Sequence, residues 1–234
     1  MSELNDRRAR KKAKTRAEIR GAAHQLFAAR GFDAVTIADV AAEADVAVQT
    51  VFNHFATKED LFFDGRTPWV DGAADAVRTR KPSVPPLTAL KNYLVALMGE
   101  LAGAYATEEW RCVSATIEAS SALRTRELQL VDRAEQRLSA ALAEAWSEDC
   151  AVPSDQITAA AVTAATWLAV ARVLLVSQRP LLSDASGVAR TAPAIKAQAE
   201  RLFGQLEQGF AAVQTAPGTG ALVTGWPGEV RQAG

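Results

Sequence analysis

The sequence predicts an all-α protein with a small N-terminal unit of three short helices and a larger helical domain after it. Apolar residues recur every three or four positions along most of the chain, which is the period of an amphipathic helix. No stretch shows the sustained alternation with β-branched enrichment that marks a strand. Gly, Pro and capping residues between the periodic segments divide the chain into individual helices.

The first helix is predicted by an apolar stripe that stops just before Gly31. Gly31 suits the left-handed position after a helix, and Phe32 can fold back onto the last aromatic residue of the stripe. The stripe consists of Ile19, Ala22, Ala23, Leu26 and Phe27.

The second helix is expected to start at Thr36, because Thr36 and Asp39 form a pattern similar to a capping box. Asp45 interrupts this helix and keeps it short, and a third short helix follows over about residues 48–54. The inner face of the second helix comprises Ile37, Val40, Ala41 and Ala44.

The fourth helix starts with a second cap pattern, Thr57 with Asp60, and runs towards Arg80. Gly65 and Pro68 should bend or interrupt it. Three prolines within residues 81–87 end it. The remaining helices are predicted at residues 87–106, 108–120, 123–149, 154–178 and 188–215, and residues 216–234 are predicted to be a flexible tail.

The composition is that of a globular protein and offers little material for catalysis. The chain has 234 residues, of which 49% are hydrophobic and 23% are charged. Its two cysteines, Cys112 and Cys150, fit no metal-ligand spacing and cannot build a disulfide framework, so we expect a reducing cytoplasm, no metal and no cofactor. We find no nucleophile–base pair and no phosphate-binding loop, so we expect no enzyme. No apolar run approaches the about 20 residues of a membrane span, so no membrane partner is expected.

The charge is unevenly distributed. Residues 1–30 carry nine Lys or Arg and three acidic residues, an excess of six positive charges on a chain whose net charge is −1. Such a block is either a solvated tail or an arm that binds a polyanion, and composition leaves both open.

The second and third helices, joined by a tight turn, have the layout of a helix-turn-helix, whose second helix enters the major groove of DNA. Ala41 is small where the two helices approach, Val46 can fill the turn, and Val51 can point inward. Polar side chains are then left on the outer face, able to reach base edges or phosphates. They are Gln49, Thr50, Asn53 and His54.

Residues 15–61 resemble the DNA-binding domain of the TetR family of transcriptional regulators. The resemblance rests on TIADVA at residues 36–41, ADVA at 44–47, TVFNHF at 50–55 and TKEDL at 57–61. It implies a basic arm at residues 1–14, a helix-turn-helix DNA-binding domain at 15–60, a helical effector-binding and dimerisation domain at 61–215, and the tail at 216–234.

The resemblance also implies DNA contacts from Thr36, Val48, Gln49, Thr50, Phe52, Asn53, His54 and Lys58. Thr36 is first a helix cap, and Lys58 is alternatively a solvated lysine. The chain departs from the family pattern at three positions. Asp45 replaces the usual Gly of the turn, Ala47 removes a candidate N-cap, and Phe52 lacks the hydroxyl of the common Tyr.

The C-terminal domain is expected to enclose a cavity for a small-molecule effector. Candidate lining residues are Trp69, Tyr93, Met98, Tyr105, Trp110, Trp167 and Arg172, although each apolar one is more often plain core. Arg172 lies among apolar residues, so it pairs with an acid such as Glu118, meets an anionic ligand, or extends to solvent.

Taken together, the resemblance implies a ligand-responsive repressor, a homodimer that binds a palindromic double-stranded DNA operator and is released by its effector. The alternative is a helical adaptor without sequence-specific DNA binding, whose basic arm meets a membrane or an acidic protein.

The last two helices are expected to form the dimer interface as a four-helix bundle. The last one offers Ile195, Ala199, Leu202, Phe203, Leu206, Phe210 and Val213, and its neighbour offers Ile157, Ala161, Ala164, Leu168, Ala171 and Leu175. Alternatively, both stripes face only the core of their own chain.

Overall fold

The computed structural model describes residues 2–105, 107–148, 156–176 and 185–215, which form ten helices and no strand. The helices are α1 Ser2–Arg30, α2 Ile37–Glu43, α3 Val48–His54, α4 Lys58–Phe63, α5 Trp69–Arg78, α6 Pro86–Ala104, α7 Glu108–Ala119, α8 Ser121–Glu148, α9 Gln156–Val176 and α10 Ala185–Thr215. The predicted all-α class is confirmed. The predicted tail at residues 216–234 and Cys150 lie outside the described residues.

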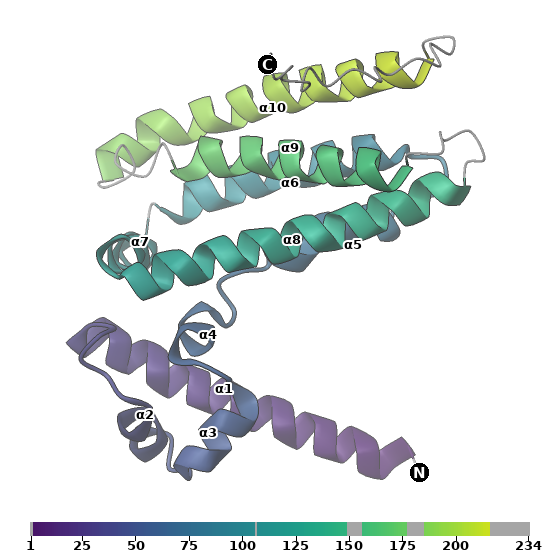
Figure 1. Ribbon diagram of the computed structural model, residues 1–234. Coiled ribbons are helices and arrows are strands. Elements are labelled where there is room, and N and C mark those ends of the chain that lie inside the picture. The colour runs from purple at the N-terminus through teal and green to yellow at the C-terminus, as the bar shows by residue number, and fades with distance from the viewer. Residues whose placement is uncertain (1, 106, 149–155, 177–184, 216–234) are drawn as a thin grey trace, which may run out of the picture.

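The helices are arranged in two bodies (Figure 1). Helices α1–α4 form the lower body, and the N-terminal half of α1 projects beyond it. The upper body is layered, with α5 and α8 nearest the lower body, α6 and α9 next, and α10 outermost. The predicted basic arm at residues 1–14 is therefore a continuation of α1, which begins at Ser2.

The end of α1 follows the predicted geometry. Gly31 has a φ of +82°, and its N–H donates to the carbonyl of Phe27 over 3.0 Å. The rings of Phe27 and Phe32 lie 5.2 Å apart, so the chain turns back against the helix it has just left.

The turn between α2 and α3 is a Schellman ending with Asp45 in the left-handed position. Asp45 has a φ of +51°. The N–H of Val46 donates to the carbonyl of Ala41 over 2.9 Å, and the N–H of Asp45 donates to that of Ala42 over 3.3 Å. Asp45 thus adopts the backbone conformation for which glycine is the usual residue.

Helix α4 is shorter than a continuous fourth helix would be. It ends at Phe63, Gly65 follows with a φ of +76°, and α5 starts only after Pro68. This confirms the predicted interruption. The side chains of Leu61, Phe62 and Phe63 belong to an apolar core that joins α1–α4 to residues of α5, α7 and α8. The predicted domain boundary between residues 60 and 61 falls inside α4.

Helix α9 requires a correction of the sequence analysis. Among the described residues, Ile157–Val176 is one helix that is long and apolar enough to cross a membrane by length and composition, with a mean hydropathy of 1.9. The expectation that no apolar run approaches this length was wrong for this segment. Part of its surface packs against α8 and α6 as core, including the fully buried Trp167.

The two apolar stripes that were predicted to form the dimer interface are partly buried within their own chain. Ile195, Ala199 and Phe203 of α10 are buried in the core of their own chain. So are three residues of the α9 stripe, Ala164, Leu168 and Ala171. Leu202, Leu206 and Leu175 are half-buried, Ile157 and Ala161 are exposed, and the side chains of Phe210 and Val213 lie outside the described residues.

Candidate DNA-binding surface and effector cavity

Helix α3 presents one buried and one exposed face. Val51 is fully buried in the lower core and fixes the helix against α1 and α2. Val48, Gln49, Phe52 and Asn53 are exposed, while Thr50 and His54 are half-buried. Of the predicted outward set, Gln49 and Asn53 are therefore exposed and Thr50 and His54 are only partly so, and the exposed Val48 and Phe52 share this surface.

The start of α3 lacks a side-chain cap. Ala47 occupies the N-cap position and accepts no hydrogen bond through its side chain. The helix is held instead by packing of Val51 and by the tight turn that precedes it. The side chains of Gln49 and Asn53, one turn apart, are joined by a hydrogen bond of 3.3 Å from Nε2 to Oδ1.

The end of α3 is tied to α1 by Arg16. An N–H of the Arg16 guanidinium donates to the His54 carbonyl over 2.5 Å, and the guanidinium carbon lies 4.1 Å from the centre of the Phe55 ring. Burial lowers the pKa of His54, and the nearby charges of Lys12 and Arg16 lower it further. His54 therefore sits, as the neutral imidazole, beside the basic side of α1.

Two predicted phosphate contacts have partners within the protein. Thr36 caps α2, because its hydroxyl accepts from the N–H of Asp39 over 3.1 Å and its own N–H donates to the Asp39 carboxylate over 2.8 Å. Hydrogen bonds from Thr36 lower the pKa of Asp39. Lys58 Nζ donates to the carbonyls of Phe32 over 2.9 Å and Val35 over 3.1 Å. These two bonds hold the α1–α2 loop and leave one N–H of the ammonium for another partner.

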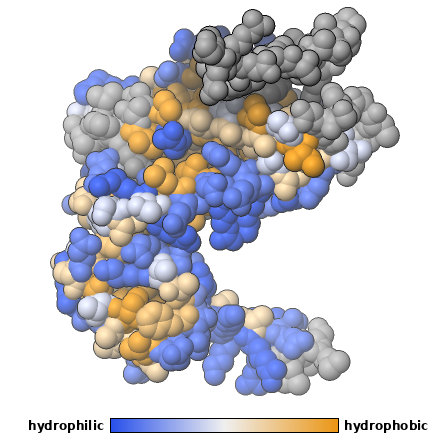
Figure 2. Space-filling model, in the orientation of Figure 1, coloured by the Kyte–Doolittle hydropathy of each residue, from blue (hydrophilic) through white to orange (hydrophobic). Residues whose placement is uncertain are grey.

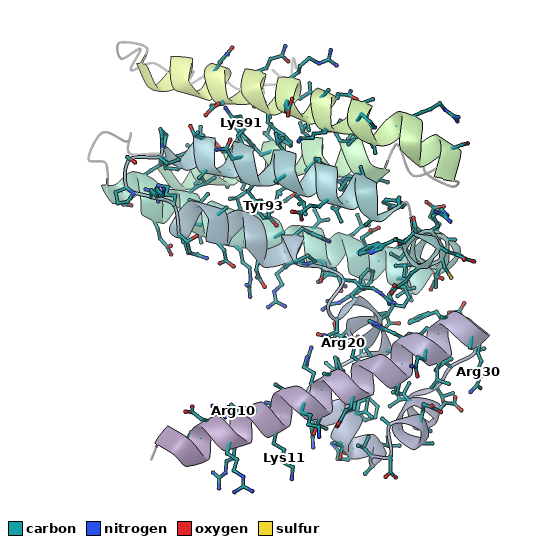
Figure 3. The ribbon with its side chains drawn as sticks, turned by 180° about the vertical axis from the view of Figure 1, so that it is seen from behind. Arg10, Lys11, Arg20, Arg30, Lys91 and Tyr93 are labelled. Atoms are coloured by element: carbon teal, nitrogen blue, oxygen red, sulfur yellow. The ribbon has the colours of Figure 1, made fainter. Side chains whose placement is uncertain are left out.

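The projecting half of α1 is a basic surface. Arg7, Arg8, Arg10, Lys11, Lys12 and Lys14 are all exposed. Figure 3 shows the side chains of Arg10 and Lys11 extending away from the ribbon of this segment. The basic block is thus spread along an exposed helix next to α3.

The upper body contains a cavity of about 340 Å³. It is lined by α5, α6, α7, α8 and α9, and by Arg66 and Thr67 of the segment after α4. Five of the seven predicted residues line it, namely Trp69, Met98, Tyr105, Trp110 and Arg172.

Tyr93 and Trp167 do not line this cavity. Trp167 is fully buried, and its ring stacks on Phe203 at 5.4 Å between centroids, so it is part of the core between α9 and α10. Tyr93 leaves α6 towards α5 (Figure 3) and lies so close to Gly72 that a Cβ at that position would clash with the Tyr93 hydroxyl. Burial raises the pKa of Tyr93 to about 12.

Several charged residues that were not predicted from the sequence surround the cavity. Arg66, Arg124 and Glu127 line it, as does Glu118, which had been considered only as a partner of Arg172. Arg66 follows Gly65 in a turn, where no periodicity signals a lining role. Its side chain donates to the Phe62 carbonyl over 2.8 Å, and burial lowers the pKa of Arg66. Within the described part of the chain, no cluster of three His, Cys, Asp or Glu residues could hold a metal ion.

Comparisons with known proteins agree with this layout. Residues 19–64 match the family described as bacterial regulatory proteins, tetR family. A stretch of 94 residues is 29% identical to the HTH-type transcriptional regulator TcmR of Streptomyces glaucescens and covers 40% of this chain. The match spans 42% of the length of TcmR, less than half of that relative.

Solved structures are among the matches as well. Salmonella enterica GusR matches with a TM-score of 0.49 and 21% identity, over 83% of this chain and 96% of that one. NalD, the secondary repressor of the MexAB-OprM multidrug efflux pump in Pseudomonas aeruginosa, matches with a TM-score of 0.48 and 18% identity, over 82% and 96%.

Proposed function

We infer from residues 19–64 that this chain belongs to the TetR family of regulators. From this premise we propose that it is a cytoplasmic DNA-binding repressor of a palindromic operator. A small-molecule effector releases it from that operator. The observation that carries the proposal is the outer face of α3, whose exposed side chains stand beside an exposed basic helix. The basic helix would supply affinity for phosphates, and α3 would supply contacts to base edges.

A continuous path of ion pairs and hydrogen bonds supports regulation by the upper body. Arg126 of α8 pairs with Asp60 of α4 at 2.5 Å. Asp64, just after α4, pairs with Arg16 of α1 at 2.5 Å, and Arg16 in turn binds the His54 carbonyl at the end of α3. A shift of α8 would therefore move groups that hold the recognition helix.

The same segment of α8 lines the cavity. Arg124, Glu127 and Leu128 line it from the turns around Arg126. An effector changes DNA affinity only if it binds the DNA-competent and DNA-incompetent states with different affinity. A cavity wall made by the helix that contacts α4 offers a physical basis for such a difference.

Assembly as a homodimer is supported by the outer face of α9. Val162 is 53% exposed, Val173 54% and Val176 38%, and Ala165 and Ala169 continue the same face at steps of three and four. A second copy covering this face would remove an apolar surface from water and bring two recognition helices to a two-fold operator. This face replaces the one that the sequence analysis predicted.

The dimer is tested by Val162→Glu combined with Val173→Glu in sedimentation experiments. We expect a folded monomer that has lost operator binding, while the exposed-site control Gln136→Glu stays dimeric. A double variant that remains a dimer of normal stability would contradict this interface.

DNA binding is tested by a gel shift with the DNA upstream of the chain's own gene. We expect retardation by the wild type, loss of it with Gln49→Ala combined with Asn53→Ala, and no loss with Gln205→Ala on the exposed side of α10. Absence of any shift by a folded wild-type protein would reject the proposal in favour of an adaptor without sequence-specific DNA binding.

A further inference from the structure

We propose that Val48 and Phe52 of α3 read the methyl groups of thymines, so that each half-site contains thymine at two positions that these side chains contact. The inference rests on the proposed DNA-binding function and names the bases that this chain prefers.

The first observation is the exposure of two large apolar side chains. Phe52 is 48% exposed and Val48 is 42% exposed. They are the only exposed large hydrophobic residues among the described residues of α1–α4. Figure 2 shows apolar surface on the lower body, where α2 and α3 lie, bordered by hydrophilic surface.

The second observation is that the two side chains lie on one side of the helix. Residues four apart on a helix are neighbours, so Val48 and Phe52 form one continuous apolar strip on α3. Four helical residues rise by about 6 Å, close to the about 7 Å spanned by two base-pair steps. The strip therefore has the length needed to meet bases two steps apart.

The chemistry of the major groove leaves one apolar partner for this strip. Base edges there carry hydrogen-bond donors and acceptors, and the C5 methyl of thymine is the apolar group. The exposed basic surface of α1 attracts a polyanion, and α3 carries no acidic side chain that would repel phosphates, so both favour DNA as the occupant.

The neighbouring polar pair supports the same base pair. Gln49 Nε2 donates to Asn53 Oδ1. The side-chain oxygen of Gln49 can therefore still accept from an outside partner, and the side-chain nitrogen of Asn53 can still donate to one. Adenine, the partner of thymine, presents the complementary N6 donor and N7 acceptor in the major groove. The apolar and polar sides of α3 thus both favour A·T pairs.

The test begins with the full-length protein and a random pool of DNA duplexes, from which preferred sequences are selected. Each thymine of the selected half-site is then replaced by deoxyuridine, which removes only the methyl group. Affinity is measured by fluorescence anisotropy. We expect two positions in each half-site at which deoxyuridine weakens binding by about fourfold, the loss that corresponds to one methyl group.

Variants then assign each methyl group to a side chain. Phe52→Ala should bind thymine and deoxyuridine equally at one position, and Val48→Ala should do so at the other. Phe52→Leu, which keeps an apolar side chain, should retain the preference for thymine. Both positions are exposed, so circular dichroism should show an unchanged fold.

The outcomes separate this inference from the proposed function. Selection of a defined sequence that binds equally well with deoxyuridine would overturn the reading of thymine methyl groups and leave DNA binding intact. A deoxyuridine penalty that persists unchanged in both alanine variants would overturn the assignment to Val48 and Phe52. Failure to select any sequence would reject the proposed function and this inference together.

Discussion

Replacing Asp45 with glycine is expected to stabilise the helix-turn-helix. Asp45 has a φ of +51°, a region in which a side chain with a Cβ costs about 1–2 kcal/mol, with Asp and Asn near the lower end. Glycine removes that cost but loses about 0.5–1 kcal/mol through its greater freedom in the unfolded chain. The net gain worked from this turn is therefore at most about 0.5 kcal/mol, which for a chain of this size raises the Tm by up to about 2 °C.

The assay is thermal unfolding followed by circular dichroism, with amide hydrogen exchange at Val46 as a local measure of the turn. The N–H of Val46 closes the turn on the Ala41 carbonyl, so its exchange should slow in Asp45→Gly. Ala42→Gly is the matched control, because residue 42 is helical and exposed and the change should cost about 1 kcal/mol. If Asp45→Gly is destabilised like Ala42→Gly, the left-handed turn is not the source of strain.

Three further predictions concern the arm, the link between the bodies, and pH. Deleting residues 1–12 should flatten the plot of log operator affinity against log salt concentration, by close to one unit of slope per lost phosphate contact, and leave the preferred sequence intact. An unchanged slope would argue against a DNA role for the arm. Arg126→Gln should lower the free energy of unfolding in urea by about 1–2 kcal/mol, because Asp60 is only 22% exposed and loses its ion pair. Adding Asp60→Asn should recover part of this loss. Strictly additive losses in the double variant would contradict a direct pairing. Burial lowers the pKa of His24 from 6.5 to about 4. Between these two pH values the unfolded chain binds a proton at His24 that the folded chain does not bind. The free energy of unfolding should therefore fall as the pH is lowered from 6.5 towards 4. A His24→Gln variant with the same acid dependence as the wild type would refute this.

Local signals predicted most of the helices correctly. The cap at Thr36, the stop at Gly31 and the interruption at Gly65 and Pro68 each depend on a few neighbouring residues, and the structure confirms them. The left-handed conformation of Asp45 was indicated only by the family resemblance, in which glycine is the usual residue at that turn.

The candidate site was predictable only in part. Periodicity placed Gln49 and Asn53 on the outer face of α3, where the structure has them. It could not show that Lys58 is held by two carbonyls of the α1–α2 loop, because that contact joins segments 26 and 23 residues apart. Arg66, which lines the cavity from a turn, carried no periodic signal at all.

The sequence by itself determined the all-α class, the order of the helices and the family resemblance of residues 15–61, because caps, turns and apolar periodicity act over a few residues. Only the tertiary structure decided which apolar face of each long helix is core. Helix α9 is apolar almost all round, so its sequence could not distinguish Leu168, which is buried, from Val162, which is exposed. That choice depends on which helices pack against α9, and it places Trp167 in the core and leaves Val162 and Val173 on the exposed face, where we propose the dimer interface.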